Sequence, residues 1–173
     1  LEHSEASLLF VGKLDKGAAQ ASALPAGLPC IALPLAPPMA CLRWGDVVAR
    51  TAPLAGRPQR AADELAMLCY TSGSTGQPKG VMHSFGRITR TVQLAIDDPQ
   101  LRLPEGVPRR VISYLPLAHI YERAVVECRG LMAGDARIFF SESIETFIDD
   151  VKRARPTVFV SVPRLWLKFQ QGL

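Results

Sequence analysis

The chain has 173 residues, of which 48% are hydrophobic and 21% are charged. This length and composition suit one globular domain, or part of a larger one, with enough apolar side chains for a core. The formal net charge is +4, but the basic residues are scattered and do not alternate with aromatic ones, which argues against a nucleic-acid surface.

The first third of the chain alternates short apolar runs with loops and helical patterns. Residues 8–11 and 30–33 are apolar runs bounded by Gly and Pro, which predict buried strands. Residues 16–24 between them are rich in alanine and predict a helix. The proline-bearing stretch 33–39 predicts a loop, and a short helical pattern follows at 44–50.

A polar linker at 53–59 leads to an apolar stretch at 65–69, which predicts the next strand. Directly after this strand comes a loop dense in hydroxyls and glycines, at 70–80. The helix beyond the loop is expected to begin near Ser84, a suitable N-cap, and to stop at Asp97-Asp98-Pro99.

The second half repeats the alternation of strands and helices. Strands are predicted at 111–115 and 136–140, with a helix at 125–132 and a turn at Gly134-Asp135 between them. Ser143 is expected to cap a further helix that ends at Pro156. Residues 157–162 form a continuous apolar run typical of a parallel strand, and Pro163 opens a last helix. The pattern predicts an α/β fold with a largely parallel sheet and helices on both faces.

The loop at 70–80 reads Tyr-Thr-Ser-Gly-Ser-Thr-Gly-Gln-Pro-Lys-Gly and predicts a phosphate-binding site. Its glycines let backbone N–H groups approach an anion, its hydroxyls donate to phosphate oxygens, and its lysine adds a mobile positive charge. The residues expected to bind phosphate are Thr71, Ser72, Gly73, Ser74, Thr75, Gly76 and Lys79.

Two common phosphate motifs do not fit this loop. A Walker A loop needs Ser or Thr after its lysine, but Gly80 follows Lys79. The dinucleotide fingerprint needs a Gly-x-Gly start, which the segment at 73–75 lacks. A solvated Ser/Gly loop between a strand and a helix stays open as the alternative.

The loop resembles the signature of the adenylate-forming (acyl-activating, AMP-binding) superfamily, Tyr-Thr-Ser-Gly-Thr-Thr-Gly-x-Pro-Lys-Gly, with Ser74 for the commoner threonine. Residues 114–123 look like the second core motif of its long-chain form, commonly Leu-Pro-Leu-x-His-x-x-Glu-Arg. Residues 155–166 are similar to a segment typical of long-chain fatty acid CoA ligases. The resemblance implies that residues 1–173 are a partial AMP-binding domain, part of the large N-terminal domain of such an enzyme.

The resemblance implies a ligase that activates a fatty acid with ATP, giving acyl-adenylate and pyrophosphate, and then transfers the acyl group to CoA. Lys79 and His119 are the candidate catalytic residues. The resemblance implies that the chain carries part of the acyl pocket, with His119 lining it near the substrate carboxylate. ATP, Mg²⁺ and CoA are the implied cofactors, and no metal ligand is expected in this chain. A core histidine is the alternative for His119, and a structural ion pair is expected for Glu122 and Arg123.

Two other functions stay open. One is an adenylating enzyme that passes its acyl group to a carrier-protein thiol, and the other is a catalytically silent folding or interaction module. Because the resemblance places the metal-binding Glu, the ribose-binding Asp and the catalytic Lys of the mobile C-terminal domain outside these residues, we expect the isolated chain to be inactive. Acyl chain length, oligomeric state and peripheral membrane association stay undecided.

The cysteines and the first residues suggest a location. Cys30, Cys41, Cys69 and Cys128 form no C-x-x-C pair or zinc-ligand cluster, so we expect reduced, mostly buried thiols. The start lacks the pattern of a secretory signal, and no apolar run has the length of a transmembrane helix. We therefore expect a soluble, cytoplasmic protein. A core strand so near the first residue suggests a piece of a longer chain.

Overall fold

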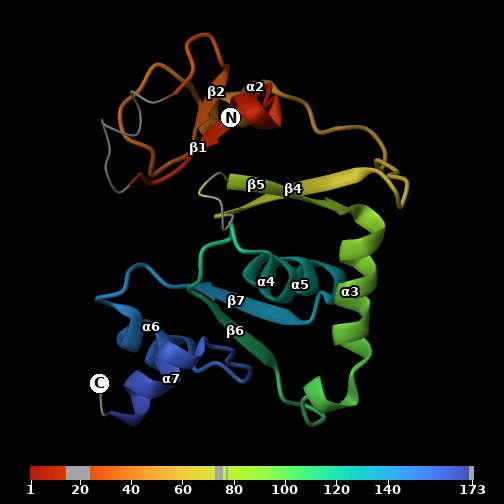
Figure 1. Ribbon diagram of the computed structural model, residues 1–173, viewed down its shortest axis with the longest axis vertical. Helices are drawn as coiled ribbons and strands as arrows, with labels where there is room; N and C mark the ends of the chain where they lie inside the picture. Colours follow the sequence, from red (N-terminus) through yellow and green to blue (C-terminus); the bar gives the residue numbers. More distant parts are fainter. Residues whose placement is uncertain (15–23, 73–75, 77, 172–173) are drawn as a thin grey trace. The chain divides into compact units, whose positions relative to one another are not determined.

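The computed structural model describes residues 1–14, 24–72, 76 and 78–171 (Figure 1). Within it the chain divides into two compact units, Leu1–Gln59 and Arg60–Leu173. The division falls at the end of the polar linker expected at 53–59. Most of the helix expected at 16–24 lies outside the described residues.

The first unit is built on a parallel sheet of three short strands in the order β1-β2-β3. Its elements are η1 (Glu2–Ser4), β1 (Leu9–Val11), β2 (Cys30–Ala32), β3 (Leu42–Arg43) and α2 (Trp44–Arg50). Val11 on the edge strand β1 and Ile31 on the central strand β2 are buried, as the apolar runs predict. The strand β3 was not expected, because two residues are too few to show a hydrophobic period.

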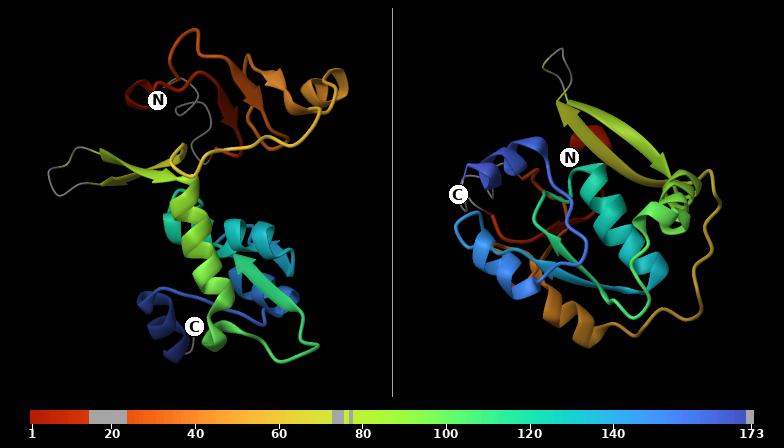
Figure 2. Two further views of the ribbon diagram at one scale, coloured as in Figure 1. Left: turned by 90° about the vertical axis from the view of Figure 1, so that its right-hand side faces the viewer. Right: turned by 90° about the horizontal axis from the view of Figure 1, so that it is seen from below.

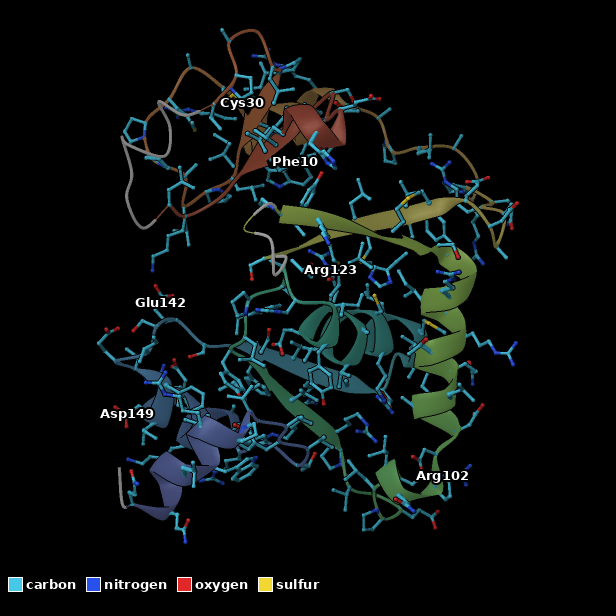
Figure 3. All side chains as sticks on the ribbon, in the orientation of Figure 1. Phe10, Cys30, Arg102, Arg123, Glu142 and Asp149 are labelled. Carbon is cyan, nitrogen blue, oxygen red and sulfur yellow. A yellow bond between two sulfur atoms is a disulfide. The ribbon has the colours of Figure 1, made fainter. Side chains whose placement is uncertain are left out.

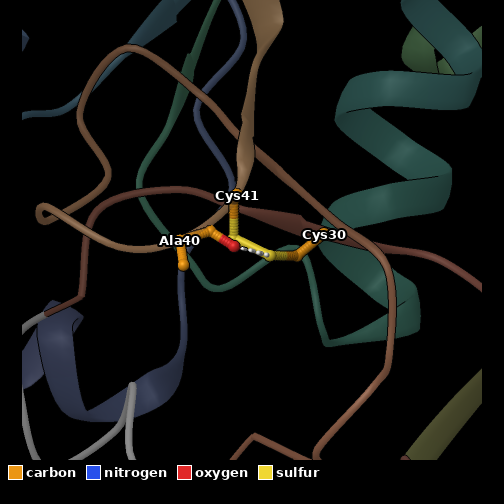
Figure 4. Close-up of a disulfide and its surroundings, with 3 residues drawn as sticks. All are labelled: Cys30, Ala40 and Cys41. Atoms are coloured by element: carbon orange, nitrogen blue, oxygen red, sulfur yellow. Dashed lines mark hydrogen bonds between the residues drawn. A yellow bond between two sulfur atoms is a disulfide. The ribbon is translucent and has the colours of Figure 1, made fainter.

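A disulfide joins Cys30 to Cys41 in the first unit, with Cα atoms 5.0 Å apart (Figure 4). The expectation of reduced thiols is therefore wrong for this pair. The reason is the parallel pairing of β2 with β3, which sets Ile31 opposite Leu42 and so brings the preceding residues of both strands together. Cys69 and Cys128 are free, as expected, but only Cys69 is fully buried.

The second unit begins with an antiparallel hairpin of β4 (Leu65–Ser72) and β5 (Pro78–Ser84). The strand at β4 confirms the prediction, but β5 was not expected because its start carries proline and glycine. Helix α3 (Phe85–Asp97) runs directly on from β5 (Figure 2). It begins where predicted, since the Ser84 hydroxyl accepts a hydrogen bond from the Arg87 N–H at 3.3 Å.

Beyond the short η2 (Pro99–Leu101), a parallel pair of strands forms the centre of the second unit, β6 (Arg109–Ser113) and β7 (Ala136–Phe140). One face is covered by a continuous helical segment, made of α4 (Ile120–Glu122), the π-helical η3 (Arg123–Cys128) and α5 (Arg129–Ala133). The opposite face packs on α6 (Phe147–Ala154), where Ile112, Phe147 and Ala154 form the core. The described residues thus form a mixed α/β fold with parallel sheets, and this central sheet has helices on both faces (Figure 1).

Several boundaries in the second unit differ from the predictions. β4 runs on to Ser72 beyond the expected 65–69, and β6 spans Arg109–Ser113 in place of 111–115. The helix expected at 125–132 begins at Ile120. The helix expected from Ser143 begins at Phe147, because Ser143 instead accepts the Thr146 N–H and holds the turn before it. In place of the strand at 157–162, Val158 alone pairs with Val111.

After Val158 the chain forms no further pairs with β6. There the Val160 carbonyl accepts from the Tyr114 hydroxyl at 3.1 Å. The last helix, α7 (Pro163–Gln170), begins at the predicted proline. Among the described residues, no helix combines the length and the apolar character needed to span a membrane.

We expect reduction of the Cys30–Cys41 disulfide to lower the free energy of unfolding of the first unit by about 2–3 kcal/mol, because the crosslink restricts the unfolded chain. Urea unfolding with and without dithiothreitol measures the effect. A Cys30→Ser/Cys41→Ser variant is the control, since its stability should equal that of the reduced protein and should not respond to the reductant. Equal stability of the oxidised and reduced wild type would contradict this.

Candidate functional site

The connecting end of the β4–β5 hairpin carries four of the seven residues predicted to bind phosphate. Thr71 lies directly opposite Lys79 in the strand register, and Ser72 lies opposite Pro78. These side chains are exposed, and Gly76 between the strands has a φ of +77° that favours glycine. Gly73, Ser74 and Thr75 lie outside the described residues.

This geometry places two hydroxyls and one ammonium group at the same end of a hairpin. The antiparallel ladder fixes the spacing between Thr71 and Lys79, so both side chains can reach a single polyanion. The segment connects two paired strands and not a strand and a helix, so the expected strand-loop-helix setting is wrong. Its binding of phosphate stays a prediction.

His119 follows the carboxyl end of β6 and stands at the N-cap of α4. Its backbone is held on both sides: its N–H donates to the Pro116 carbonyl at 2.9 Å, and its carbonyl accepts from the Arg123 N–H at 3.2 Å. The imidazole does not cap the helix and is exposed. The core-histidine alternative thus does not describe this structure.

Glu122 and Arg123 do not form the expected ion pair with each other. Glu122, 3% exposed, accepts from the Ser113 hydroxyl at 2.7 Å and from the Tyr114 N–H at 3.2 Å. Arg123 (Figure 3) donates from Nε to the Leu117 carbonyl at 3.0 Å and pairs with Glu127 at 2.9 Å. Both side chains therefore hold the segment 114–119, which carries His119.

An apolar cavity of about 490 Å³ lies beside the same segment, where β6 and β7 end. Its walls include Tyr114, Leu115 and Pro116 from this segment and Ile144, Phe147 and Leu165 from the chain around α6 and α7. Two charged residues, Glu142 and Arg164, also line it. Tyr114 packs against the rings of Phe147 and Phe159, with centroids 4.9 and 5.9 Å away. The resemblance implied part of an acyl pocket near His119, but the sequence showed these lining residues only as separate helix and strand patterns.

The fold is that of the N-terminal domain of adenylate-forming enzymes, with parallel α/β structure and a Ser/Thr/Gly segment between paired strands. A family model described as AMP-binding enzyme matches residues 1–173, and the chain belongs to this family.

Its similar proteins include long-chain acyl-CoA ligases. The chain is 40% identical over 111 residues to the peroxisomal long chain acyl-CoA synthetase 7 of Arabidopsis thaliana, covering 64% of this chain and 15% of the relative. It is 41% identical over 105 residues to the human long-chain-fatty-acid–CoA ligase 1, covering 61% and 15%. The chain thus corresponds to about 15% of the length of these curated relatives.

Among solved structures, ATP-bound MatB from Rhodopseudomonas palustris superposes with a TM-score of 0.70 at 26% identity. The match covers 97% of this chain and 32% of that one. The fold and the AMP-binding family predicted from the sequence are thus confirmed, and this solved relative is described as ATP-bound.

Replacing Glu122 with alanine should lower the free energy of unfolding by about 1–3 kcal/mol, because the buried Ser113 hydroxyl and Tyr114 N–H would lose their acceptor. Glu127→Ala is the matched control: it removes a half-exposed carboxylate from the same helical segment and should cost less than about 1 kcal/mol. Urea unfolding of both variants measures the difference. Equal losses would show that Glu122 does not hold the segment.

Proposed function

We propose that this chain is the phosphate-loop and acyl-pocket part of an ATP-dependent long-chain fatty acid CoA ligase. The proposal rests chiefly on the apolar cavity of about 490 Å³ beside the segment that presents His119. The aromatic and aliphatic walls of the cavity suit a hydrocarbon chain, and His119, three residues after the lining residue Pro116, would suit the carboxylate of that chain. Relatives at about 40% identity that are long-chain acyl-CoA ligases support the assignment.

In the proposed first step, the fatty carboxylate attacks the α-phosphorus of ATP while pyrophosphate leaves. The P–O bond to pyrophosphate breaks as the bond to the carboxylate oxygen forms. The hydroxyls of Thr71 and Ser72 and the ammonium of Lys79 would hold the β and γ phosphates, where negative charge grows during the reaction. Gly76 lets the end of the hairpin rearrange as pyrophosphate departs.

His119 would orient the attacking carboxylate by donating one hydrogen bond to it. The hydrogen bonds of its backbone N–H and carbonyl, together with those of Glu122 and Arg123, hold the segment that carries His119. Mg²⁺ would supply further neutralisation of the phosphates. The described residues include no group of three or more His, Cys, Asp or Glu side chains that could hold a metal ion.

In the complete enzyme, Lys79→Ala should slow formation of the acyl-adenylate by about 2–4 kcal/mol in barrier, the size of one preorganised electrostatic contact. Thioester formation from preformed acyl-adenylate should stay normal. Single-turnover assays of the two steps measure this, with Lys152→Ala, an exposed lysine on α6, as the control of equal charge change. A loss confined to the second step would contradict the role of Lys79.

His119→Ala should slow acyl-adenylate formation at least tenfold, about 1.4 kcal/mol in barrier, with little change in melting temperature because the side chain is exposed. His119→Gln, which keeps a hydrogen-bond donor, should lose less. Melting and single-turnover assays on the same preparations decide the matter. A large fall in melting temperature with normal adenylation by the folded fraction would make His119 structural instead.

A further inference from the structure

The amino-terminal edge of the β6–β7 sheet carries a group of charged residues that the proposed reaction does not use. It consists of Arg109 at the start of β6, Arg129 at the start of α5, Asp135 before β7 and Arg102 in the preceding loop; we call it the arginine cluster (Figure 3 labels Arg102). Arg109 and Arg129 are each only 8% exposed. Buried guanidinium groups are costly unless anions accompany them.

One carboxylate serves both buried arginines. Asp135 accepts two hydrogen bonds from Arg129, at 2.8 and 3.2 Å. Arg109 has one terminal nitrogen on the Leu101 carbonyl at 2.7 Å, while its Nε lies 3.5 Å from Asp135. That separation is within ion-pair range, but the Nε of Arg109 makes no hydrogen bond. Among the described residues it is the only buried side-chain nitrogen or oxygen without a hydrogen-bond partner.

The charges of the cluster do not balance. Hydrogen bonds from Arg129 lower the pKa of Asp135, so this carboxyl is ionised at neutral pH. Burial and the neighbouring Arg129 lower the pKa of Arg109, which accords with an excess of positive charge around it. Two buried cations share one carboxylate whose side chain is 47% exposed, and an additional anion would compensate the remaining charge.

A cavity of about 330 Å³ opens onto the cluster. Arg102, Arg109, Arg129 and Asp135 contribute to its lining, together with Val107 and Pro108. The direction of the strands determines where this cavity lies. Because β6 and β7 are parallel, their first residues lie at one edge of the sheet, whereas the segment that carries His119 follows the opposite edge. The cluster is therefore separate from the site proposed for adenylation.

We propose that the arginine cluster binds a compact oxyanion, the phosphate or carboxylate group of a small molecule, at the sheet edge opposite His119. Guanidinium groups match both anions through paired hydrogen bonds, and the excess positive charge supplies the attraction. The proposal stands on the geometry of the cluster and does not depend on the ligase assignment.

The test is calorimetric titration of the complete protein with inorganic phosphate and, separately, with acetate. Lys79→Ala serves as the background, so that the β4–β5 hairpin contributes less to anion binding. Arg109→Gln should weaken binding at least tenfold through loss of a charge-assisted contact. Arg153→Gln, which removes a mostly exposed arginine from α6, should leave it unchanged. Tighter binding of phosphate than of acetate assigns the site to phosphate groups, and the reverse assigns it to carboxylates.

Asp135→Asn provides a second test, in which the expected result is a gain of anion affinity and not a loss. Removing the internal carboxylate leaves both arginines to the external anion, so phosphate should bind about tenfold more tightly and should raise the melting temperature more than in the Lys79→Ala parent. A cluster with a purely structural role would show no such gain. The proposal is overturned if Asp135→Asn gains no affinity for either anion, or if Arg109→Gln binds both as well as the parent.

Discussion

The hydrogen bonds of the buried Glu122 carboxylate are the contacts on which the candidate site depends most. They connect the start of a helix to the last residue of β6 and to the residue after it. Because the backbone between these points must turn back on itself, the carboxylate determines where the segment 114–119 can lie. The aromatic side of the cavity and the imidazole of His119 both belong to this segment. Glu122 itself is not expected to contact substrate. It nevertheless determines the positions of Tyr114, which lines the cavity, and of His119, which is proposed to bind the substrate carboxylate.

The parallel strands β6 and β7 give the second unit two functionally different edges. Their carboxyl ends lead into the cavity and the histidine, while their amino ends meet the arginine cluster. Between them lie only the five paired positions of each strand. The helical segment from Ile120 to Ala133 contributes to both edges, with Glu122 near one and Arg129 near the other.

Sequence reasoning worked best where the signal was local. Apolar runs and end signals such as Ser84 and Pro163 located most strands and helices of the described chain. Contacts between distant segments were not visible in the sequence: β5 depends on pairing with β4, and the Cys30–Cys41 bond depends on the register of two strands. The same holds for Glu122, whose adjacent arginine suggested an ion pair although its partners lie nine and eight residues earlier.

The left-handed turn at Gly134 closes one edge of the central sheet with a very short piece of chain. Arg129 and Asp135 on either side of it are six residues apart, whereas Arg110 and Ala154, which join β6 to the end of α6, are separated by 44. The entropy lost on closing a chain loop grows with its length. Forming the contact between α5 and β7 therefore costs less chain entropy than forming the contact between β6 and α6, which joins distant segments. The helices on the two faces of this small sheet thus differ in the entropy that is lost when they pack.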